Sequence, residues 1–215
     1  MPPPARVFVI DDHPVVRLGI RQMIGSDQSL LICGEADSSQ AALERIYDAK
    51  PDLVLTDLSL ERGISLDLIA QLHEARPDLP VLVLSVHDEL LFAERTLRAG
   101  ARGYIMKEEA ITGLLSAIHQ VLSGHMYLSA RMSERLAQRI RNAGTEMAGL
   151  ASLTNRELEV FQMIGRGLST QTIAIQLRVS VKTIETYRSN IKTKLDLKDA
   201  TDLIRHAAVW ATTRL

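Results

Sequence analysis

The chain has 215 residues, 46% of them hydrophobic, and a formal net charge of −1. This length suits one large or two small domains with real apolar cores. No apolar run reaches the eighteen residues that span a membrane, and the first residues lack the apolar stretch of a signal peptide, so we expect a cytoplasmic protein with no membrane partner. The single cysteine, Cys33, excludes an intramolecular disulfide and lies in an apolar run, which favours a small buried side chain over a redox role.

The small net charge conceals an asymmetry along the chain. Counting Lys and Arg against Asp and Glu, residues 1–128 carry −7, residues 129–150 carry +2 and residues 151–215 carry +4. An acidic front half indicates a metal ion or a protein partner, and a basic back half indicates a polyanion. We therefore expect a first domain over 1–128, a linker over 129–150 and a second domain over 151–215.

Strand-like and helix-like patterns alternate five times over the first 124 residues. Apolar runs of strand length cover 6–10, 30–36, 53–55, 81–84 and 103–106, and helical patterns cover 14–24, 40–49, 66–75, 89–98 and 111–123. Such alternation implies right-handed crossovers and a parallel sheet that helices cover on both faces. We predict an α/β domain with a flavodoxin-like, doubly wound sheet of five parallel strands in the order 2-1-3-4-5.

Polar side chains follow four of these strands. Asp11 and Asp12 follow the first strand, Asp57 the third, Ser85 the fourth and Lys107 the fifth. Ligands bind at the carboxyl ends of such strands, where three carboxylates would repel one another unless a cation lies between them. A hard divalent ion with oxygen ligands, Mg²⁺, meets that need. The alternative is that the first two aspartates only cap the helix that follows.

Residues 6–124 resemble the receiver domain of bacterial response regulators. The resemblance rests on Asp-Asp-His-Pro at 11–14, on Asp57, on Ser85 and on Gly-Ala-Arg-Gly-Tyr-Ile-Met-Lys at 100–107. It implies that Asp57 accepts a phosphoryl group from a sensor histidine kinase or a small acyl phosphate. The Mg²⁺ ligands that it implies are Asp11, Asp12, Asp57 and the backbone carbonyl of Ser59.

The chemistry of phosphoryl transfer agrees with these residue types. Asp57 is the nucleophile, Lys107 and Mg²⁺ offset the developing charge, and the Ser85 hydroxyl donates to a phosphoryl oxygen. The resemblance also implies that the aromatic ring of Tyr104 turns inward once Ser85 moves; the alternative is an ordinary half-buried strand residue. His87 borders the site, where it either influences the lifetime of the phosphoryl group or is a solvated loop residue.

The loop after Asp57 departs from the family pattern. Glu61 stands where members usually have proline, and Ser65 where they usually have glycine. Because proline stiffens a turn, we expect a looser or differently shaped loop. The departure bears on partner specificity and on the lifetime of the phosphoryl group more than on the chemistry.

The linker region 129–150 carries two stripes at helical spacing, one apolar and one basic. The stripes consist of Met132, Leu136 and Ile140 and of Arg131, Arg135 and Arg139. We predict a short amphipathic helix with a hinge over 144–149 after it. The arginines form either a solvated face or a contact with DNA phosphates or with the other domain.

The back half has the pattern of a helix-turn-helix domain. Thr154-Asn-Arg-Glu157 is a capping box before an apolar helix, which Gly165-Arg-Gly167 ends. A short helix over 169–177 and a third over 181–195 follow, the latter capped by Ser180. We expect a small all-α domain.

Residues 152–210 resemble the LuxR-type DNA-binding domain, through Leu-Thr-x-Arg-Glu at 153–157 and Val-Ser-Val-Lys-Thr-Ile-Glu-Thr-Tyr-Arg-Ser-Asn-Ile at 179–191. A receiver joined to this module is the architecture of the NarL/FixJ class. The third helix is expected to enter the major groove. The residues expected to face base edges are Glu185, Thr186 and Ser189, and those expected to reach phosphates are Lys182, Thr183, Arg188, Lys192 and Lys194.

Glu185 has two interpretations. Its carboxylate can accept a hydrogen bond from a cytosine amino group, or it can position the neighbouring basic side chains.

The two resemblances predict a transcriptional regulator, not an enzyme, that binds double-stranded DNA and forms a homodimer when Asp57 is phosphorylated. One alternative is a regulator that uses its receiver only as a dimerisation scaffold. The other is a phosphohydrolase working through an aspartyl-phosphate. Such enzymes need a second acid two residues after the nucleophile, where this chain has Ser59.

Overall fold

The structure is a computed structural model that describes residues 3–60, 63–141, 150 and 152–212. The chain divides into two compact units, Met1–Gln138 and Arg139–Leu215. No helix in the described ranges is long and apolar enough to cross a membrane. Each unit is described by itself below.

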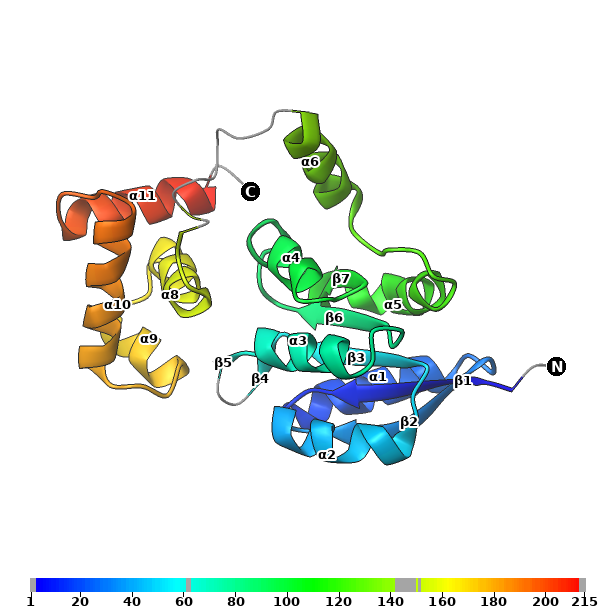
Figure 1. Cartoon of the computed structure of the whole chain (residues 1–215). Coiled ribbons are helices and arrows are strands. Elements are labelled where there is room, and N and C mark those ends of the chain that lie inside the picture. The colour runs from blue at the N-terminus through cyan, green and yellow to red at the C-terminus, as the bar shows by residue number, and fades with distance from the viewer. Residues whose placement is uncertain (1–2, 61–62, 142–149, 151, 213–215) are drawn as a thin grey trace. The chain divides into compact units, whose positions relative to one another are not determined.

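The first unit is built on a five-stranded parallel sheet (Figure 1). Its strands are β1 (Ala5–Ile10), β2 (Leu30–Ala36), β3 (Leu53–Asp57), β6 (Val81–Ser85) and β7 (Gly103–Met106). Its helices are α1 (Pro14–Gly25), α2 (Ser39–Ala49), α3 (Leu66–Ala75), α4 (Glu89–Arg98) and α5 (Lys107–Leu122). The strand order β2-β1-β3-β6-β7 confirms the predicted flavodoxin-like order.

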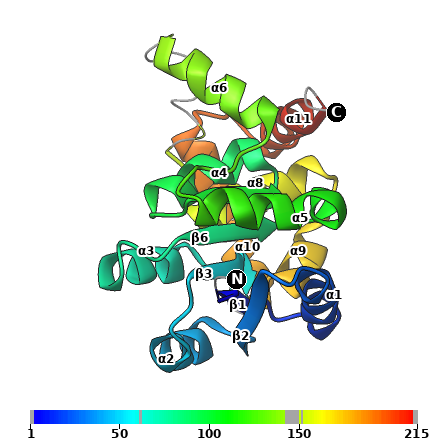
Figure 2. The ribbon, with the colours of Figure 1, turned by 90° about the vertical axis from the view of Figure 1, so that its right-hand side faces the viewer.

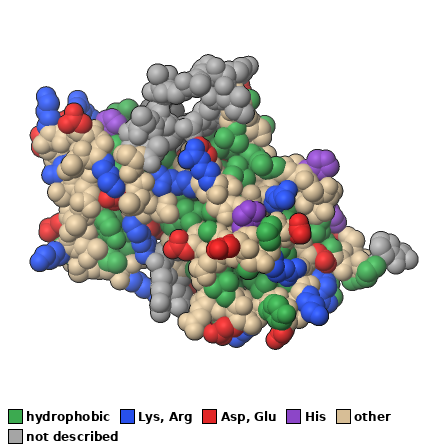
Figure 3. Space-filling view, viewed as in Figure 1, with side chains coloured by type: hydrophobic (Ala, Val, Ile, Leu, Met, Phe, Trp, Pro, Cys, Tyr) green, Lys and Arg blue, Asp and Glu red, His purple; other side chains and the backbone are tan. Residues whose placement is uncertain are grey.

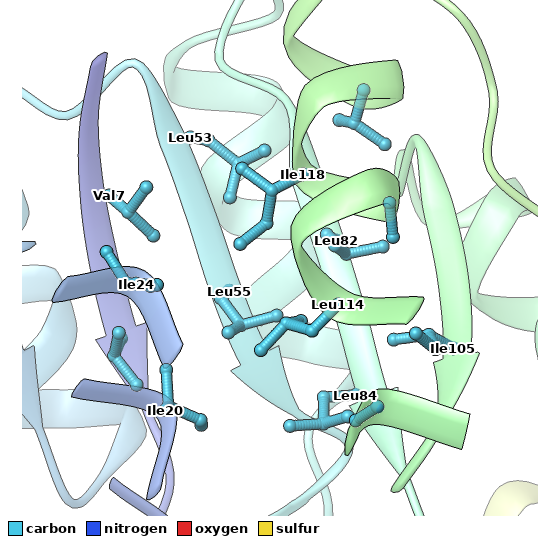
Figure 4. Close-up of a cluster of buried hydrophobic side chains, with 14 of the residues drawn as sticks. Val7, Ile20, Ile24, Leu53, Leu55, Leu82, Leu84, Ile105, Leu114 and Ile118 are labelled. Carbon is cyan, nitrogen blue, oxygen red and sulfur yellow. The ribbon is translucent and has the colours of Figure 1, made fainter. Parts of the chain in front are cut away.

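The sheet is buried on both faces, which explains the unbroken apolar runs of its strands. Inward-facing side chains of β1, β3, β6 and β7 pack against α1 and α5, as Figure 4 shows for Leu55, Leu84 and Leu114. Helices α2, α3 and α4 cover the other face (Figure 2). The polar ends of the strands are therefore held on a rigid layer.

Helix α5 begins at Lys107, four residues earlier than the sequence pattern indicated. Glu108 and Glu109 lie in its first turn, where acidic side chains favour the positive end of the helix dipole. Lys107 is thus placed at a strand end and a helix start at once, and its side chain reaches back over the sheet edge.

The loop after Asp57 contains a small antiparallel hairpin that the sequence patterns did not indicate. Strands β4 (Ser59–Leu60) and β5 (Gly63–Ile64) pair with each other. The hydroxyl of Ser65 donates to the carbonyls of Asp57 (3.0 Å) and Leu58 (2.9 Å). Ser65 therefore ties the end of the loop to the end of β3, whereas Glu61 lies outside the described residues, so the expected departure in loop shape stays a prediction.

A helix, α6 (Ala130–Arg141), covers part of the linker region. The Ser129 hydroxyl oxygen accepts from the backbone N–H of Met132 (3.0 Å), and the hydroxyl donates to Glu89 Oε1 (2.7 Å). Met132 is buried. The start of α6 is thus anchored to α4, while the expected hinge over 144–149 lies outside the described residues.

The second unit consists of four described helices after the linker, α8 (Asn155–Gly165), α9 (Thr170–Gln176), α10 (Val181–Lys194) and α11 (Ala200–Thr212). The capping box of Thr154 and Glu157 is present, and Ser169 and Ser180 cap α9 and α10. The buried hydrophobic side chains of the described part of this unit are Leu153, Leu158, Val160, Phe161, Ile164, Ile173, Ala174, Ile184, Ile191, Leu203 and Ala207. The unit has the helix-turn-helix arrangement, with α10 as its third helix.

Gly165 has a packing role that its place at the end of α8 did not reveal. A Cβ atom at this position would lie 2.5 Å from the backbone oxygen of Ala207 in α11. Only glycine therefore lets α8 and α11 approach this closely.

Candidate functional site

The acidic strand ends meet at one edge of the sheet. Strands β1 and β3 are neighbours with Ile10 beside Thr56, so Asp11 and Asp57 lie next to each other. Both are almost fully buried, at 1% and 3% exposure. The predicted convergence of the first and third strand ends is thus realised.

Lys107 bridges the two carboxylates. Its Nζ atom lies 2.7 Å from Asp11 Oδ2 and 2.6 Å from Asp57 Oδ2. Burial opposes the charge of the ammonium group, but the two carboxylates outweigh it and raise the pKa of Lys107. Burial also raises the pKa of Asp57, and the Lys107 charge offsets part of that rise. Leaving any one of these three charges without its partner would therefore destabilise the fold.

Asp12 and His13 complete an acidic cluster that can hold a metal ion. One ligand atom from each of Asp11, Asp12, His13 and Asp57 lies within 4.8 Å of the others. Among the described residues no hydrogen bond to the buried Asp12 Oδ1 is found, and its near neighbour His13 Nδ1, 2.7 Å away, forms an ion pair with it only when protonated. A buried carboxylate oxygen without a donor and a surplus of hard oxygen ligands both fit Mg²⁺.

Ser59 contacts the site through its backbone N–H and its hydroxyl, and the expected role of its carbonyl as a metal ligand stays a prediction. Its backbone N–H donates to Asp57 Oδ1 (3.1 Å). Its side-chain hydroxyl is hydrogen-bonded to His87 Nε2 (2.5 Å).

His87 joins the remaining site residues. Its backbone N–H donates to Ser85 Oγ (3.0 Å), and its carbonyl accepts from the Tyr104 hydroxyl (2.7 Å). His87 is buried, which excludes the solvated-loop interpretation. The sequence singled out His87 only as a border residue, because neither pattern nor spacing signals a contact made through its backbone.

Tyr104 lies inward in this structure. Its exposure is 1%, so it is not a half-buried strand residue. Burial raises the pKa of Tyr104 far above the usual range, and the phenol stays protonated as the donor to His87. Ser85 is fully buried beside it.

Helix α10 has the two faces that its sequence predicts. Ile184 and Ile191 are buried in the helical unit. Lys and Arg side chains lie on the outer surface of this unit (Figure 3). The exposed polar residues of the helix are Lys182, Glu185, Thr186, Ser189, Asn190, Thr193 and Lys194.

Two expected phosphate contacts already have partners within the unit. Lys194 Nζ lies 2.6 Å from Glu157 Oε2, a buried carboxylate that also accepts from the backbone N–H of Thr154. Thr183 Oγ1 is hydrogen-bonded to Ser180 Oγ (2.8 Å) in the cap of α10. Arg188 and Lys192 are partly exposed, and Lys182 is exposed.

Models of two known protein families match the two halves of the chain. The family model of the response regulator receiver domain matches residues 7–119. The model of bacterial regulatory proteins of the luxR family matches residues 151–207. The two matches cover the units that carry the acidic site and the helix-turn-helix.

Two similar regulators match this chain over nearly the whole length of both proteins. The transcriptional activator protein ExaE of Pseudomonas putida is 36% identical over 95% of this chain and 96% of its own length. The response regulator GacA of Pseudomonas viridiflava is 33% identical over 96% of this chain and 99% of its own.

Solved structures show the same fold. RcsB of Salmonella enterica serovar Typhimurium, bound to promoter rprA in the presence of phosphomimetic BeF3−, is 24% identical, covers 95% of this chain and 98% of its own, and has a TM-score of 0.62. The response regulator ChrA of a heme-sensing two-component system is 29% identical over 96% of this chain and 98% of its own, with a TM-score of 0.52. The chain therefore belongs to the two-component response regulators that join a receiver domain to a LuxR-type DNA-binding domain and regulate transcription.

Proposed function

We propose that Asp57 is the phosphoacceptor of this regulator and that its sensor histidine kinase is the donor. One observation carries the proposal: the Lys107 ammonium bridges Asp57 and Asp11 at 2.6 and 2.7 Å. A fixed cation beside the nucleophile is what phosphoryl transfer requires, because its catalysis is mainly positioning and neutralisation of charge. The Asp57 carboxylate attacks phosphorus while the bond from phosphorus to the kinase's histidine nitrogen breaks and the histidine leaves as imidazole. Lys107 then pairs with a phosphoryl oxygen.

The residues proposed to hold Mg²⁺ are Asp11, Asp12, Asp57 and the carbonyl of Ser59. The orphaned Asp12 oxygen supports this assignment. When bound, the ion would offset negative charge on the phosphoryl oxygens. The protein's own contribution is to hold Asp11 and Asp57 buried on adjacent strands, which fixes their oxygens before any ion arrives.

The response to phosphorylation is proposed to run through Ser85, His87 and Tyr104. A phosphoryl group adds a charge of about −1.5 to −2 and strong acceptor oxygens. Donation by the Ser85 hydroxyl to one of these would move the oxygen that now accepts from the His87 N–H. Tyr104 donates to the carbonyl of the same residue, so its inward position and the Ser85 position are linked through one backbone unit.

The second unit is proposed to bind double-stranded DNA as a homodimer, with two copies of α10 in successive major grooves about 34 Å apart. Glu185, Thr186 and Ser189 are assigned to base edges, and Lys182, Thr183, Arg188, Lys192 and Lys194 to phosphates. The exposure of most of these side chains supports the assignment, whereas the partners of Thr183 and Lys194 weaken it for those two. A regulator that binds DNA is proposed to act in the cytoplasm, without a membrane partner.

Incubation with a small acyl phosphate and Mg²⁺, followed by intact mass, tests the phosphoacceptor directly. The wild-type protein is expected to gain the mass of one phosphoryl group, and the Asp57→Asn variant none. A gain of the same mass by the Asp57→Asn variant would show that Asp57 is not the phosphoacceptor. A wild-type gain without any effect of Asp57→Asn on regulation would favour the receiver as a dimerisation scaffold.

A further inference from the structure

The exposed face of α10 has fewer hydrogen-bond donors available for base edges than its sequence indicates. Thr186 Oγ1 donates to the backbone oxygen of Lys182 in the preceding turn (3.0 Å). A threonine hydroxyl has one hydrogen, so Thr186 has no donor left for a base acceptor such as guanine O6 or N7. Its hydroxyl oxygen can still accept a hydrogen bond, and its methyl group remains free for an apolar contact.

In contrast to the Thr186 hydroxyl, the Glu185 carboxylate is not engaged within the helix. Glu185 is exposed, and across the described ranges its carboxylate forms no hydrogen bond or ion pair, although Lys182 and Arg188 lie one turn away on either side. An ionised carboxylate only accepts hydrogen bonds. In the major groove it suits the amino group of cytosine and is repelled by the acceptors of guanine and thymine.

The neighbouring side chains on this face discriminate less between the four bases. The hydroxyl of Ser189 can donate or accept, so it suits either kind of base edge. The Thr183 hydroxyl is held in the Ser180 cap. Lys182 is a flexible cation, which pairs as well with phosphate as with guanine.

We propose that Thr186 and Glu185 together set sequence specificity, Thr186 by contact of its methyl group with the C5-methyl of a thymine and Glu185 by accepting from the amino group of a neighbouring cytosine. The two residues are adjacent, which separates them by about 1.5 Å along the helix and about 100° around it. They therefore face neighbouring base pairs. Both lie in the first half of α10, the part of a recognition helix that reaches base edges. The inference rests on the proposed DNA binding.

The experiment begins by selecting preferred duplexes from a random-sequence library with the full-length protein after treatment with acyl phosphate and Mg²⁺. Each conserved thymine of the selected site is then replaced by deoxyuridine, which lacks only the C5-methyl. Affinity for one such substitution, made in a single half-site, is expected to fall about fourfold, the effect of one lost methyl contact.

Two variants of Thr186 test whether its methyl group makes this contact with the thymine methyl. Thr186→Ser removes the methyl and keeps the hydroxyl, so the variant is expected to bind thymine and deoxyuridine sites equally. Thr186→Val keeps a methyl at the same place and is expected to retain the fourfold difference. Retention of the thymine preference by Thr186→Ser, or its absence in the wild type, would overturn the assignment of Thr186.

Glu185→Gln tests the second contact. Glutamine pairs with adenine through N6 and N7, so the preferred base at the neighbouring position is expected to change from cytosine to adenine by roughly tenfold in relative affinity. An unchanged preference would exclude a base contact by Glu185. Enrichment of no sequence at all would overturn the proposed DNA-binding function itself, whereas enrichment of sites insensitive to all three variants would overturn only this inference.

Discussion

At the scale of single residues, Lys107 is the group on which the acidic site depends. Asp11 and Asp57 are both buried, and each has a carboxylate oxygen within 2.7 Å of the Lys107 ammonium. Removing one partner of a buried ion pair leaves an uncompensated charge, which costs more than the pair contributes when it is intact.

Lys107→Met is therefore expected to lower the free energy of unfolding of the receiver by about 3 kcal/mol without Mg²⁺. Urea unfolding followed by far-ultraviolet circular dichroism measures it. Added Mg²⁺ should restore more stability to the variant than to the wild type, because it replaces the missing cation. Lys182→Met, which changes an exposed lysine, is the control. A variant as stable as the wild type in chelator would contradict the role of Lys107.

Glu157 gives the helical unit a dependence on pH. Burial alone would raise the pKa of its carboxyl, but hydrogen bonds from Lys194 and Thr154 outweigh burial and lower it. A group whose folded-state pKa is depressed stabilises the fold above its unfolded-state pKa of about 4.3 and loses that contribution as pH falls through the folded-state value.

We expect the unfolding free energy of this unit to fall as pH drops below about 5. The single tryptophan, Trp210, lies in α11 with its ring 6.1 Å from that of Phe161, so its fluorescence reports this unit. Glu157→Gln should flatten the acid dependence, and Glu185→Gln, at an exposed carboxylate, should not. Equal acid dependence in all three proteins would refute the assignment.

At the scale of elements, the salt dependence of DNA binding separates cations that reach phosphates from those that hold the fold. Without Lys194, three basic residues of α10 remain for phosphates, Lys182, Arg188 and Lys192. Six contacts in a dimer give a slope of log affinity against log salt of about −5.

Lys192→Gln is expected to reduce the steepness of this slope by about 2 in a dimer, and Lys194→Gln to leave it unchanged. Both variants are compared by salt titration under conditions where Trp210 fluorescence shows the unit folded. An equal reduction in both would mean that Lys194 leaves Glu157 to bind phosphate.

Sequence patterns predicted the elements whose signal is long and periodic. The five strands, their order and the edge where Asp57 and Lys107 meet follow from apolar runs that end in polar residues. The two-residue strands of the hairpin after Asp57 are too short to have a period, so Ser65 was noted only as a missing glycine. The contacts of His87 and Lys194 depend on packing between distant segments, which no local pattern encodes.

At the scale of the molecule, an acidic receiver and a basic helix-turn-helix unit share one chain. Ser129 and Met132 anchor the start of α6 to the receiver, next to the α4 residue Glu89. Since Glu89 follows the His87 and Asp88 loop, we expect a change at Ser85 to reach a segment that contacts the start of α6. We therefore expect phosphorylation of Asp57 to control DNA binding through such contacts.

The most direct test measures affinity for a selected operator before and after phosphorylation, in the wild type and in Asp57→Asn, at fixed salt concentration and with oligomeric state followed in parallel. We expect tighter binding, together with dimer formation, only when the wild-type protein carries the phosphoryl group. Equal affinity of the phosphorylated and unmodified wild-type protein, with equal oligomeric state, would contradict it.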